Sequence, residues 1–339
     1  MPIEQNQKAF DNKKYLNLEK KALLKRANKF DQLFLEIGGH LLHDGHASRV
    51  LPGYNSKNKL ELIKSLNNKT AIFYCVSAKE LELNRNWGNT NQKIKNIAIF
   101  ELKKLIKEIN ICGVIISRFN NEKKAIDFAL NISKLFNIPV YFNNEIKNYP
   151  NLKSTFSKSG FDAQPKIKSS KKIIVVTGAG ANNGKLFFCL SQIYHQTKIG
   201  KNAGYAKIET FPVWDLAVNH PVNLAYMAAT ADINDKVMID PYYKKAYGKI
   251  VVNYNRDIDA FKVLKKLIKK MSKKNNFMRN YKSPTDMGLN EISKGFNNEK
   301  KIINASKKEI LNRKKSFEKI GNKLAVKRIN KLLEKLIKS

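Results

Sequence analysis

The segment from Lys171 to Lys185, KKIIVVTGAGANNGK, has the residue types that bind a phosphate group. Ile173 to Val176 form a short apolar run, typical of a buried strand in a parallel sheet. A glycine-rich turn follows, and an amphipathic helix opens at Gly184-Lys185. The amides of such a turn and of the helix N-terminus point at an anion, and the lysine adds a mobile positive charge. The sequence therefore predicts binding of a nucleotide or another phosphorylated ligand.

This loop departs at two positions from the G-x-x-x-x-G-K-[ST] motif of phosphate-binding loops. Ala179 stands at the first glycine position, and Leu186 stands where Ser or Thr would hold magnesium. A tight strand–helix turn that merely uses glycine is the alternative interpretation. We expect the ligand-binding residues to be Thr177, Gly178, Gly180, Asn182, Asn183, Gly184, Lys185 and Thr210.

The next predicted strand, 204–210, carries polar residues at its carboxyl end. In a doubly wound sheet these ends line the ligand crevice, so Lys207 and Glu209 are expected beside the phosphates. Lys207 would neutralise charge on a transferred group, and Glu209 or Asp232 would hold a metal ion such as magnesium. The arrangement resembles dethiobiotin-synthetase-like P-loop ligases, but only from the loop to this strand.

A polar loop, 40–53, follows a predicted strand at 33–37. His40, His43 and His46 are three residues apart, but a helix would splay their rings and a loop would not fix them, so a three-histidine metal site is not favoured. We expect His46 and Arg49 to contact a second substrate, with Arg49 gripping a carboxylate or phosphate through both arms of its guanidinium. A purely structural loop is the alternative.

Strands alternate with amphipathic helices along most of the chain, which predicts a parallel sheet with helices on both faces. The stretch 147–170 breaks this alternation with prolines, glycine and serines. We therefore predict an α/β fold of two Rossmann-like or P-loop-like parallel-sheet halves, followed by a helical C-terminal segment. The predicted domains are 1–150, then 151–257 with the phosphate-binding loop, then a lysine-rich helical segment at 258–339.

The net charge of +36 has two explanations. Nucleic-acid binding is one, and 24 basic against 6 acidic residues in 261–339 would place it on the C-terminal helices. Coding bias is the other, because the chain has 56 lysines and only eight arginines, and base and phosphate recognition favours arginine. Nucleic-acid binding is therefore not favoured.

Other features of the sequence indicate a cytoplasmic protein without a membrane partner. No apolar run approaches the roughly 20 residues of a membrane-spanning helix, and the lysine-rich first residues do not form a secretory signal. Cys75, Cys112 and Cys189 lack the spacing of a disulfide framework or a metal site.

The chain resembles an uncharacterised bacterial protein family, recorded as a domain of unknown function. The resemblance runs from about Ala9 to Asn312 and rests on the motifs HASRVLPG (46–53), AGYAKIETFPV (203–213), HPVNLAYMAATAD (220–232), NYNRD (253–257) and KSPTDMG (282–288). It implies a fold and no defined activity. Because members of the family usually carry a further C-terminal domain, we expect this chain to be a short form or part of a longer protein.

We predict a nucleotide- or phosphate-binding enzyme with ligase- or kinase-like phosphoryl transfer. Its cofactors would be ATP or another nucleotide, with magnesium, and its partner a phosphorylated small molecule; a homo-oligomer is compatible with the sequence. A non-catalytic phosphometabolite or nucleotide sensor is the main alternative, because Leu186 removes the usual magnesium ligand. A basic nucleic-acid-associated protein is a third hypothesis.

Overall fold

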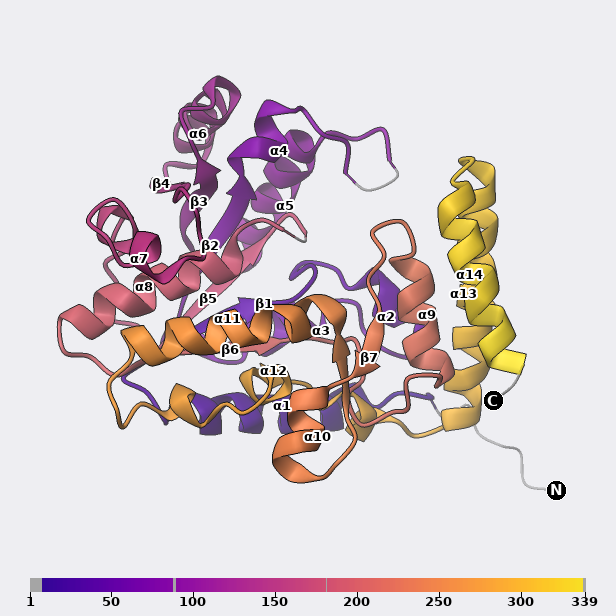
Figure 1. Ribbon diagram of the computed structural model, residues 1–339. Helices are drawn as coiled ribbons and strands as arrows, with labels where there is room; N and C mark the ends of the chain where they lie inside the picture. The colour runs from indigo at the N-terminus through magenta and orange to yellow at the C-terminus, as the bar shows by residue number, and fades with distance from the viewer. Residues whose placement is uncertain (1–7, 88–89, 181, 338–339) are drawn as a thin grey trace.

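The computed structural model describes residues 8–87, 90–180 and 182–337 as a mixed α/β fold (Figure 1). Seven strands form one sheet in the order β4-β3-β2-β5-β1-β6-β9, with every neighbouring pair parallel. They are β1 (Gln32–Ile37), β2 (Thr70–Ser77), β3 (Ile111–Phe119), β4 (Val140–Asn144), β5 (Ile173–Gly178), β6 (Ala203–Ile208) and β9 (Gly288–Leu289). The predicted α/β class is confirmed.

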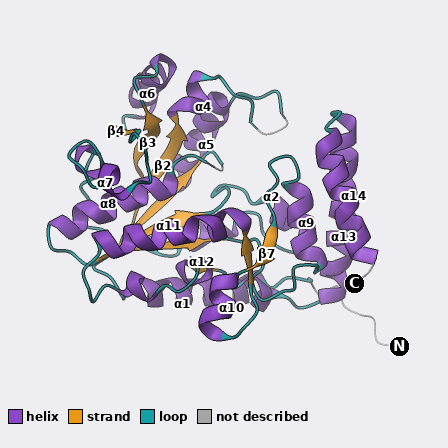
Figure 2. Ribbon diagram, in the orientation of Figure 1, coloured by secondary structure: helices purple, strands orange, loops and turns teal. Residues whose placement is uncertain are grey.

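Helices surround this sheet (Figure 2). They are α1 (Asn12–Ala27), α2 (Gly45–Val50), α3 (Asn58–Lys64), α4 (Ala78–Glu82), α5 (Ile94–Glu108), α6 (Lys123–Phe136), α7 (Leu152–Thr155), α8 (Lys185–Lys198), α9 (Pro221–Ala229), α10 (Pro241–Tyr247), α11 (Asn255–Met271), α12 (Pro284–Met287), α13 (Glu299–Lys319) and α14 (Lys323–Ile337). The strands β7 (Val237–Ile239) and β8 (Val252–Tyr254) form a separate antiparallel pair. Within the described ranges, no helix is both long and apolar enough to cross a bilayer.

The strands expected in two halves lie in one continuous sheet. β5 inserts between β2 and β1, and β6 pairs with the other side of β1. Local periodicity identifies a buried strand but not its neighbours, and β5, buried along its whole length, needs a partner on each side. One sheet therefore replaces the expected pair of sheets. The division of the chain at residues 150 and 257 into separate domains stays a prediction.

From β1 the chain moves to one edge of the sheet through β2, β3 and β4, then returns to β5 and moves to the other edge through β6 and β9. Because parallel crossovers are right-handed, α3, α5 and α6 fall on one face and α8 on the other. α11 lies against α8 (Figure 1). Its Phe261, Leu264 and Leu267 are buried in the core of the sheet. The predicted helical C-terminal segment is thus confirmed, and it also covers and extends the sheet.

A second hydrophobic core lies beyond the carboxyl edge of the sheet. It joins α2, α9, α13 and α14, with Val50, Leu224, Ile310 and Ile329 among its buried residues. α2 lies within the stretch expected to be a polar loop, and Asp44 caps its N-terminus by accepting a hydrogen bond from the Ala47 amide. The loops after β1 and β6 therefore pack against the C-terminal helices (Figure 1).

Two adjacent positions of α13 test whether this second core is part of the folded unit. Ile310 is fully buried and Leu311 is 48% exposed. We expect Ile310→Ala to lower the free energy of unfolding by about 2–5 kcal/mol, because it leaves a cavity. Leu311→Ala should change it by less than about 1 kcal/mol. Urea denaturation measures both, and equal small effects would contradict the packing.

Candidate functional site

A cleft of about 1450 Å³ opens at the carboxyl edge of the sheet. It lies where the connections from the central strands diverge, which is the usual ligand position in open α/β sheets. Its lining comes from the ends of β1, β3, β4 and β6, from the loop after β5, and from α2, α8, α9, α11 and α13. The cleft brings together these residues of the sequence prediction: His46, Arg49, Asn182, Asn183, Gly184, Lys185, Lys207, Glu209 and Thr210.

Four other predicted residues are not among the described residues that line the cleft: Thr177, Gly178, Gly180 and Asp232. Thr177 is buried within β5. A Cβ on Gly178 would lie 2.4 Å from the Cys75 carbonyl oxygen, so this glycine allows close packing with β2. The Asp232 carbonyl accepts a hydrogen bond from Arg328 at 3.2 Å. These positions support the site through packing and main-chain contacts.

The turn between β5 and α8 is held by its own side chains. Gly180, Asn182 and Gly184 have positive φ angles of 137°, 60° and 72°. When the Asn183 carboxamide is oriented to satisfy its hydrogen bonds, its oxygen accepts from the Ala179 and Gly180 amides, each at 3.0 Å. The Asn183 side chain therefore occupies two amides that a phosphate-binding loop would present to its ligand.

The N-terminus of α8 remains directed at the cleft. Its N-cap residue, Gly184, provides no side-chain cap, and Leu186 and Phe187 of the first turn line the cleft. The Lys185 ammonium donates to the Gly180 carbonyl at 2.8 Å, which uses one of its three donors. The anion-binding capacity of this segment thus lies at the helix end and at Lys185.

Two more cations line the same cleft as this helix end. Arg118 follows the buried part of β3 with φ 54°, and Lys147 follows β4; both line the cleft. A Cβ on Gly184 would lie 2.5 Å from that of Ser117, which places the Arg118 backbone against the loop. Within 8–87, 90–180 and 182–337, no carboxylate forms an ion pair with Arg118, Lys147 or Lys185. This corner of the cleft therefore has uncompensated positive charge.

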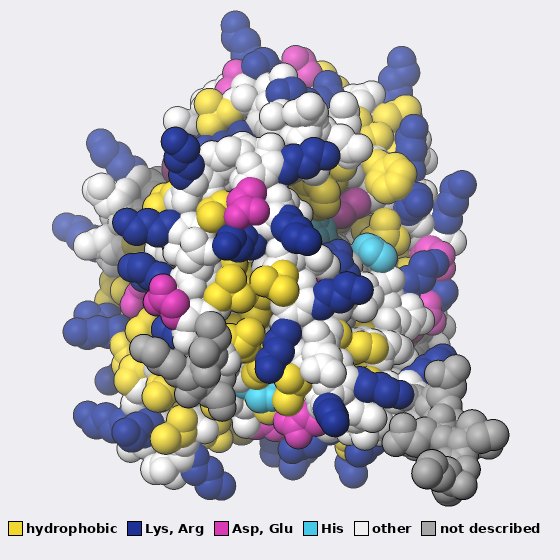
Figure 3. All heavy atoms as spheres, turned by 90° about the vertical axis from the view of Figure 1, so that its right-hand side faces the viewer, with side chains coloured by type: hydrophobic (Ala, Val, Ile, Leu, Met, Phe, Trp, Pro, Cys, Tyr) yellow, Lys and Arg dark blue, Asp and Glu magenta, His cyan; other side chains and the backbone are white. Residues whose placement is uncertain are grey.

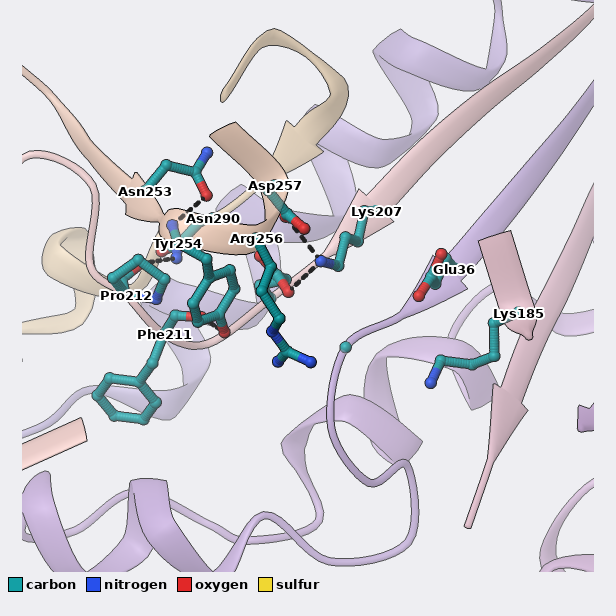
Figure 4. Close-up of polar contacts among 12 residues, drawn as sticks. Glu36, Lys185, Lys207, Phe211, Pro212, Asn253, Tyr254, Arg256, Asp257 and Asn290 are labelled. Atoms are coloured by element: carbon teal, nitrogen blue, oxygen red, sulfur yellow. Dashed lines mark hydrogen bonds and ion pairs between the residues drawn. The ribbon is translucent and has the colours of Figure 1, made fainter. Parts of the chain in front are cut away.

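Lys207, unlike these cations, is surrounded by carboxylates (Figure 4). Its ammonium is 2.7 Å from a Glu209 oxygen and 2.8 Å from an Asp257 oxygen. Glu36 is its register partner on β1 and accepts a hydrogen bond from Tyr205 at 2.8 Å. Burial alone would lower the pKa of Lys207, but Asp257, Glu209 and Glu36 together raise it well above its usual value.

The pKa of Glu209 is raised above its ordinary value. Burial is the main cause that raises its pKa to about 8; Lys207 opposes the shift, and Asp257 and Glu36 add to it. Burial and the neighbouring carboxylates together outweigh the attraction of the Lys207 ammonium, which favours the protonated form of Glu209. Glu209 can therefore give or take a proton at physiological pH.

A second buried cluster fixes the loops that surround the cleft. The Lys59 ammonium contacts Asp44 at 2.9 Å and the Gly38 carbonyl at 2.7 Å, and Thr210 donates to Asp44 at 2.6 Å. Burial would raise the pKa of Asp44, but Lys59 and Thr210 lower it to about 2. The Thr210 hydroxyl is thus committed to Asp44, so this residue ties the β6 loop to the start of α2.

His46 packs between aromatic rings, with centroids 4.8 Å from Phe211 and 6.0 Å from Tyr226. Burial lowers its pKa to about 4, so the ring is neutral at pH 7, and neither ring nitrogen has a hydrogen-bond partner among the described residues. His40 instead contacts Glu101 at 3.0 Å, and His43 is exposed. The three histidines thus form no common site.

Nor do the two expected metal ligands form a pair. Glu209 already contacts Lys207, and Asp232 lies outside the cleft lining. In the described part of the chain, no group of three or more His, Cys, Asp or Glu could hold a metal ion. The residues present therefore do not fit a resident metal at Glu209 and Asp232.

Several residues of the cleft were not placed by sequence reasoning. Arg256 donates to Asp235 at 2.7 Å, and neither residue is among the predicted site residues. Arg313 of α13 also lines the cleft, although its segment was expected to be a lysine-rich helix without a site. The scarcity of arginine in this chain was the available signal, because each arginine departs from a strong lysine preference.

Comparison with known proteins gives the family. A family model described as "Domain of unknown function DUF1846, N-terminal" matches residues 8–337. The chain belongs to this family. A UPF0371 protein of Clostridium botulinum (strain Alaska E43 / Type E3) is 41% identical over 308 residues, which cover 90% of this chain and 60% of that protein. A UPF0371 protein of Streptococcus pyogenes serotype M28 is 42% identical over 312 residues, covering 90% and 61%.

The family predicted from the five motifs is therefore confirmed as one without an assigned activity. The chain spans about 60% of the length of these curated relatives. What the DUF1846 domain does must accordingly be argued from the cleft itself.

Two glycines test the packing of the loop against β3. Gly184 and Gly200 both have positive φ, but a Cβ on Gly200 would have nothing within 4 Å. Alanine at either position carries the left-handed penalty of about 1 kcal/mol. We expect Gly184→Ala to destabilise the fold by about 1–3 kcal/mol more than Gly200→Ala, because it also overpacks against Ser117. Urea denaturation measures the free energy of unfolding of both variants. Equal losses would show that Ser117 can move away from the new Cβ at no cost, which contradicts the predicted overpacking.

The buried imidazole of His46 predicts a pH dependence of stability. Its pKa is about 4 in the folded protein against an ordinary value of 6.5, so between these values the unfolded chain binds the proton more readily. Stability should therefore fall as pH decreases from 6.5 to 4, with a contribution of up to about 1.4 kcal/mol per pH unit. Denaturation of wild type and His46→Gln across this range should show a flatter profile for the variant. Parallel profiles would contradict the burial of a neutral ring.

Proposed function

We propose that the cleft binds a nucleotide or another phosphorylated small molecule at the N-terminus of α8 and supports phosphoryl transfer of the ligase or kinase type. One observation carries the proposal: three cations that form no ion pair among the described residues, Arg118, Lys147 and Lys185, line the same cleft as the uncapped N-terminus of α8. Backbone amides at a helix N-terminus and flanking cations are the ordinary means of holding phosphate.

The size of the cleft favours more than one substrate. Its volume of about 1450 Å³ exceeds the roughly 300–1,000 Å³ of a pocket for one small molecule. A phosphorylated ligand at α8 leaves room toward β6 and α13 for an acceptor. Transfer between two bound molecules is therefore compatible with the space available.

Lys207 and Glu209 are the proposed reacting groups. The Lys207 ammonium would stabilise negative charge that develops on a transferred group, because its carboxylate partners fix its position. Glu209, with a pKa of about 8, would accept a proton from an attacking hydroxyl or return one to a leaving group. The proposal does not include a metal ion bound by Glu209 and Asp232, because Glu209 contacts Lys207 and Asp232 lies outside the cleft lining.

Two features favour the sensor alternative. Leu186 occupies the position of the usual magnesium ligand, and Asn183 fills part of the loop that would cradle a phosphate chain. Tight binding of a nucleotide without turnover over a panel of acceptors would assign this role. The same binding with transfer to an acceptor would assign the enzyme.

Nucleic-acid binding receives less support from the surface. On the face shown in Figure 3, lysines and arginines are scattered among hydrophobic and neutral side chains. A nucleic-acid-binding surface is more often a continuous basic patch or stripe.

Calorimetric titration with ATP, ADP and pyrophosphate, each with and without magnesium, tests the proposal. Lys185→Ala and Arg118→Gln should each weaken binding by about 10- to 100-fold, since each removes a charged hydrogen-bond donor. Lys201→Ala is the matched control, because this exposed lysine follows α8 outside the cleft lining. Absence of binding to wild type, or wild-type affinity in both cleft variants, would reject the proposed phosphate site.

A further inference from the structure

Arginine is concentrated in the cleft. The chain has eight arginines, and four of them line the cleft: Arg49, Arg118, Arg256 and Arg313. Among its 56 lysines, four line it within the described ranges. The guanidinium differs from the ammonium in its planar fork, which binds carboxylate and phosphate through two parallel hydrogen bonds. Half of the arginines of the chain thus lie in the cleft, where a guanidinium fork could bind an anionic ligand.

Two of these arginines share one carboxylate. The Nε atom of Arg49, on α2, lies 2.8 Å from Oε1 of Glu309, and the Nε atom of Arg313 lies 2.7 Å from the same oxygen. Glu309 is buried, with only 3% of its side chain exposed. Burial alone would raise its pKa, but the hydrogen bond from Arg49 and the charge of Arg313 lower it. The carboxylate therefore acts as a fixed clamp for both guanidinium groups.

The outer ends of both guanidinium groups are available. Each arginine contacts Glu309 through Nε, and in the described part of the chain neither forms a hydrogen bond through its terminal Nη atoms. The side chains are 46% and 27% exposed, and both line the cleft. Two positive charges against one negative charge leave a surplus of one at this wall.

Arg256, in the same cleft, has a different arrangement of charges. Arg256 pairs with a single carboxylate, Asp235, through a terminal nitrogen at 2.7 Å. One cation against one anion satisfies the desolvation requirement of a half-buried pair. The second arginine at Glu309 exceeds that requirement, and among the described residues its Nη atoms have no partner of their own. An anion from solution would complete the arrangement.

The surroundings of the pair suit a small organic anion. His46 lies beside it, with Nδ1 3.9 Å from the same Glu309 oxygen, and its ring is neutral at pH 7. Phe211 and Tyr226, with ring planes 11° apart, form an aromatic wall next to this histidine. A ligand here would meet two guanidinium forks and an apolar surface.

We propose that Arg49 and Arg313, clamped by Glu309, form a second anion-binding subsite that takes the carboxylate or phosphate group of the acceptor. The inference deepens the proposed function, since it names the chemical class of the second substrate. It does not require that the helix end of α8 binds phosphate, because the two groups of cations belong to different elements.

Protection from phenylglyoxal, which modifies guanidinium groups, tests the subsite on the full chain. The probes are inorganic phosphate and succinate, and peptide mass spectrometry follows the modification rate of each arginine. At a probe concentration about ten times its dissociation constant, the rates at Arg49 and Arg313 should fall by about tenfold. Arg85, which is exposed and pairs with Glu80 outside the cleft lining, serves as the internal control.

The two probes distinguish the chemical source of the anion. Protection by succinate alone assigns a carboxylate, protection by phosphate alone assigns a phosphate group, and protection by both assigns a general anion site. Protection by neither, or equal protection of Arg85, overturns the proposal.

The same measurement in Lys185→Ala separates this inference from the proposed function. Protection of Arg49 and Arg313 should persist in that variant even if binding at α8 is lost or never existed. If protection disappears with Lys185, the cleft holds a single site and the second subsite is rejected.

A conservative variant tests the role of the guanidinium fork. Arg49→Lys keeps the charge beside Glu309 but removes the bidentate geometry, so the probe concentration that protects Arg313 should rise about tenfold. Arg85→Lys is the matched control and should leave that concentration unchanged. Wild-type protection of Arg313 in Arg49→Lys would show that the second guanidinium does not contact the anion, which contradicts the paired subsite.

Discussion

In an all-parallel sheet, every strand delivers its last residues to the same edge. Because β5 lies between β2 and β1, the glycine loop that follows β5 lies beside chain segments that are distant in sequence. Glu36 on β1 is in register with Val176 on one side and Lys207 on the other. The loops that continue from these three strands therefore share one cleft. The helical second core can then close over that edge.

The cleft combines two kinds of electrostatic environment. Around Lys207 the protein supplies more carboxylates than cations, and burial together with the neighbouring carboxylates raises the pKa of Glu209 to about 8. At Lys185 and Arg118 the described residues supply cations without carboxylates. Arg118 is exposed and can draw on water or on a bound anion, whereas the buried Lys185 donates to the Gly180 carbonyl. The cleft is therefore electrostatically polar, with cations toward α8 that form no ion pair among the described residues and an excess of carboxylates toward β6.

Sequence reasoning located the strands and the glycine loop but not their neighbours. The apolar run at Ile173–Val176 and the following Gly184-Lys185 are local signals, and the structure places both as expected. The insertion of β5 between two earlier strands depends on pairings that no local pattern encodes. The amide-filling role of Asn183 depends on a turn geometry that appears only in three dimensions. The contribution of Arg313 was hidden in a helix whose lysine-rich composition resembles a solvated surface.

The clamp at Glu309 joins residues that are 260 positions apart, since Arg49 lies on α2 and Glu309 on α13. Chains emerge from the ribosome from the N-terminus, and distant contacts form after local ones because long loops must close first. All but the short edge strand β9 precede α11 in the chain, so the sheet can assemble while α13 is still being made. We therefore expect the wall of the cleft between α2 and α13 to be the last part of this domain to fold. Ligand binding would then report on completed folding.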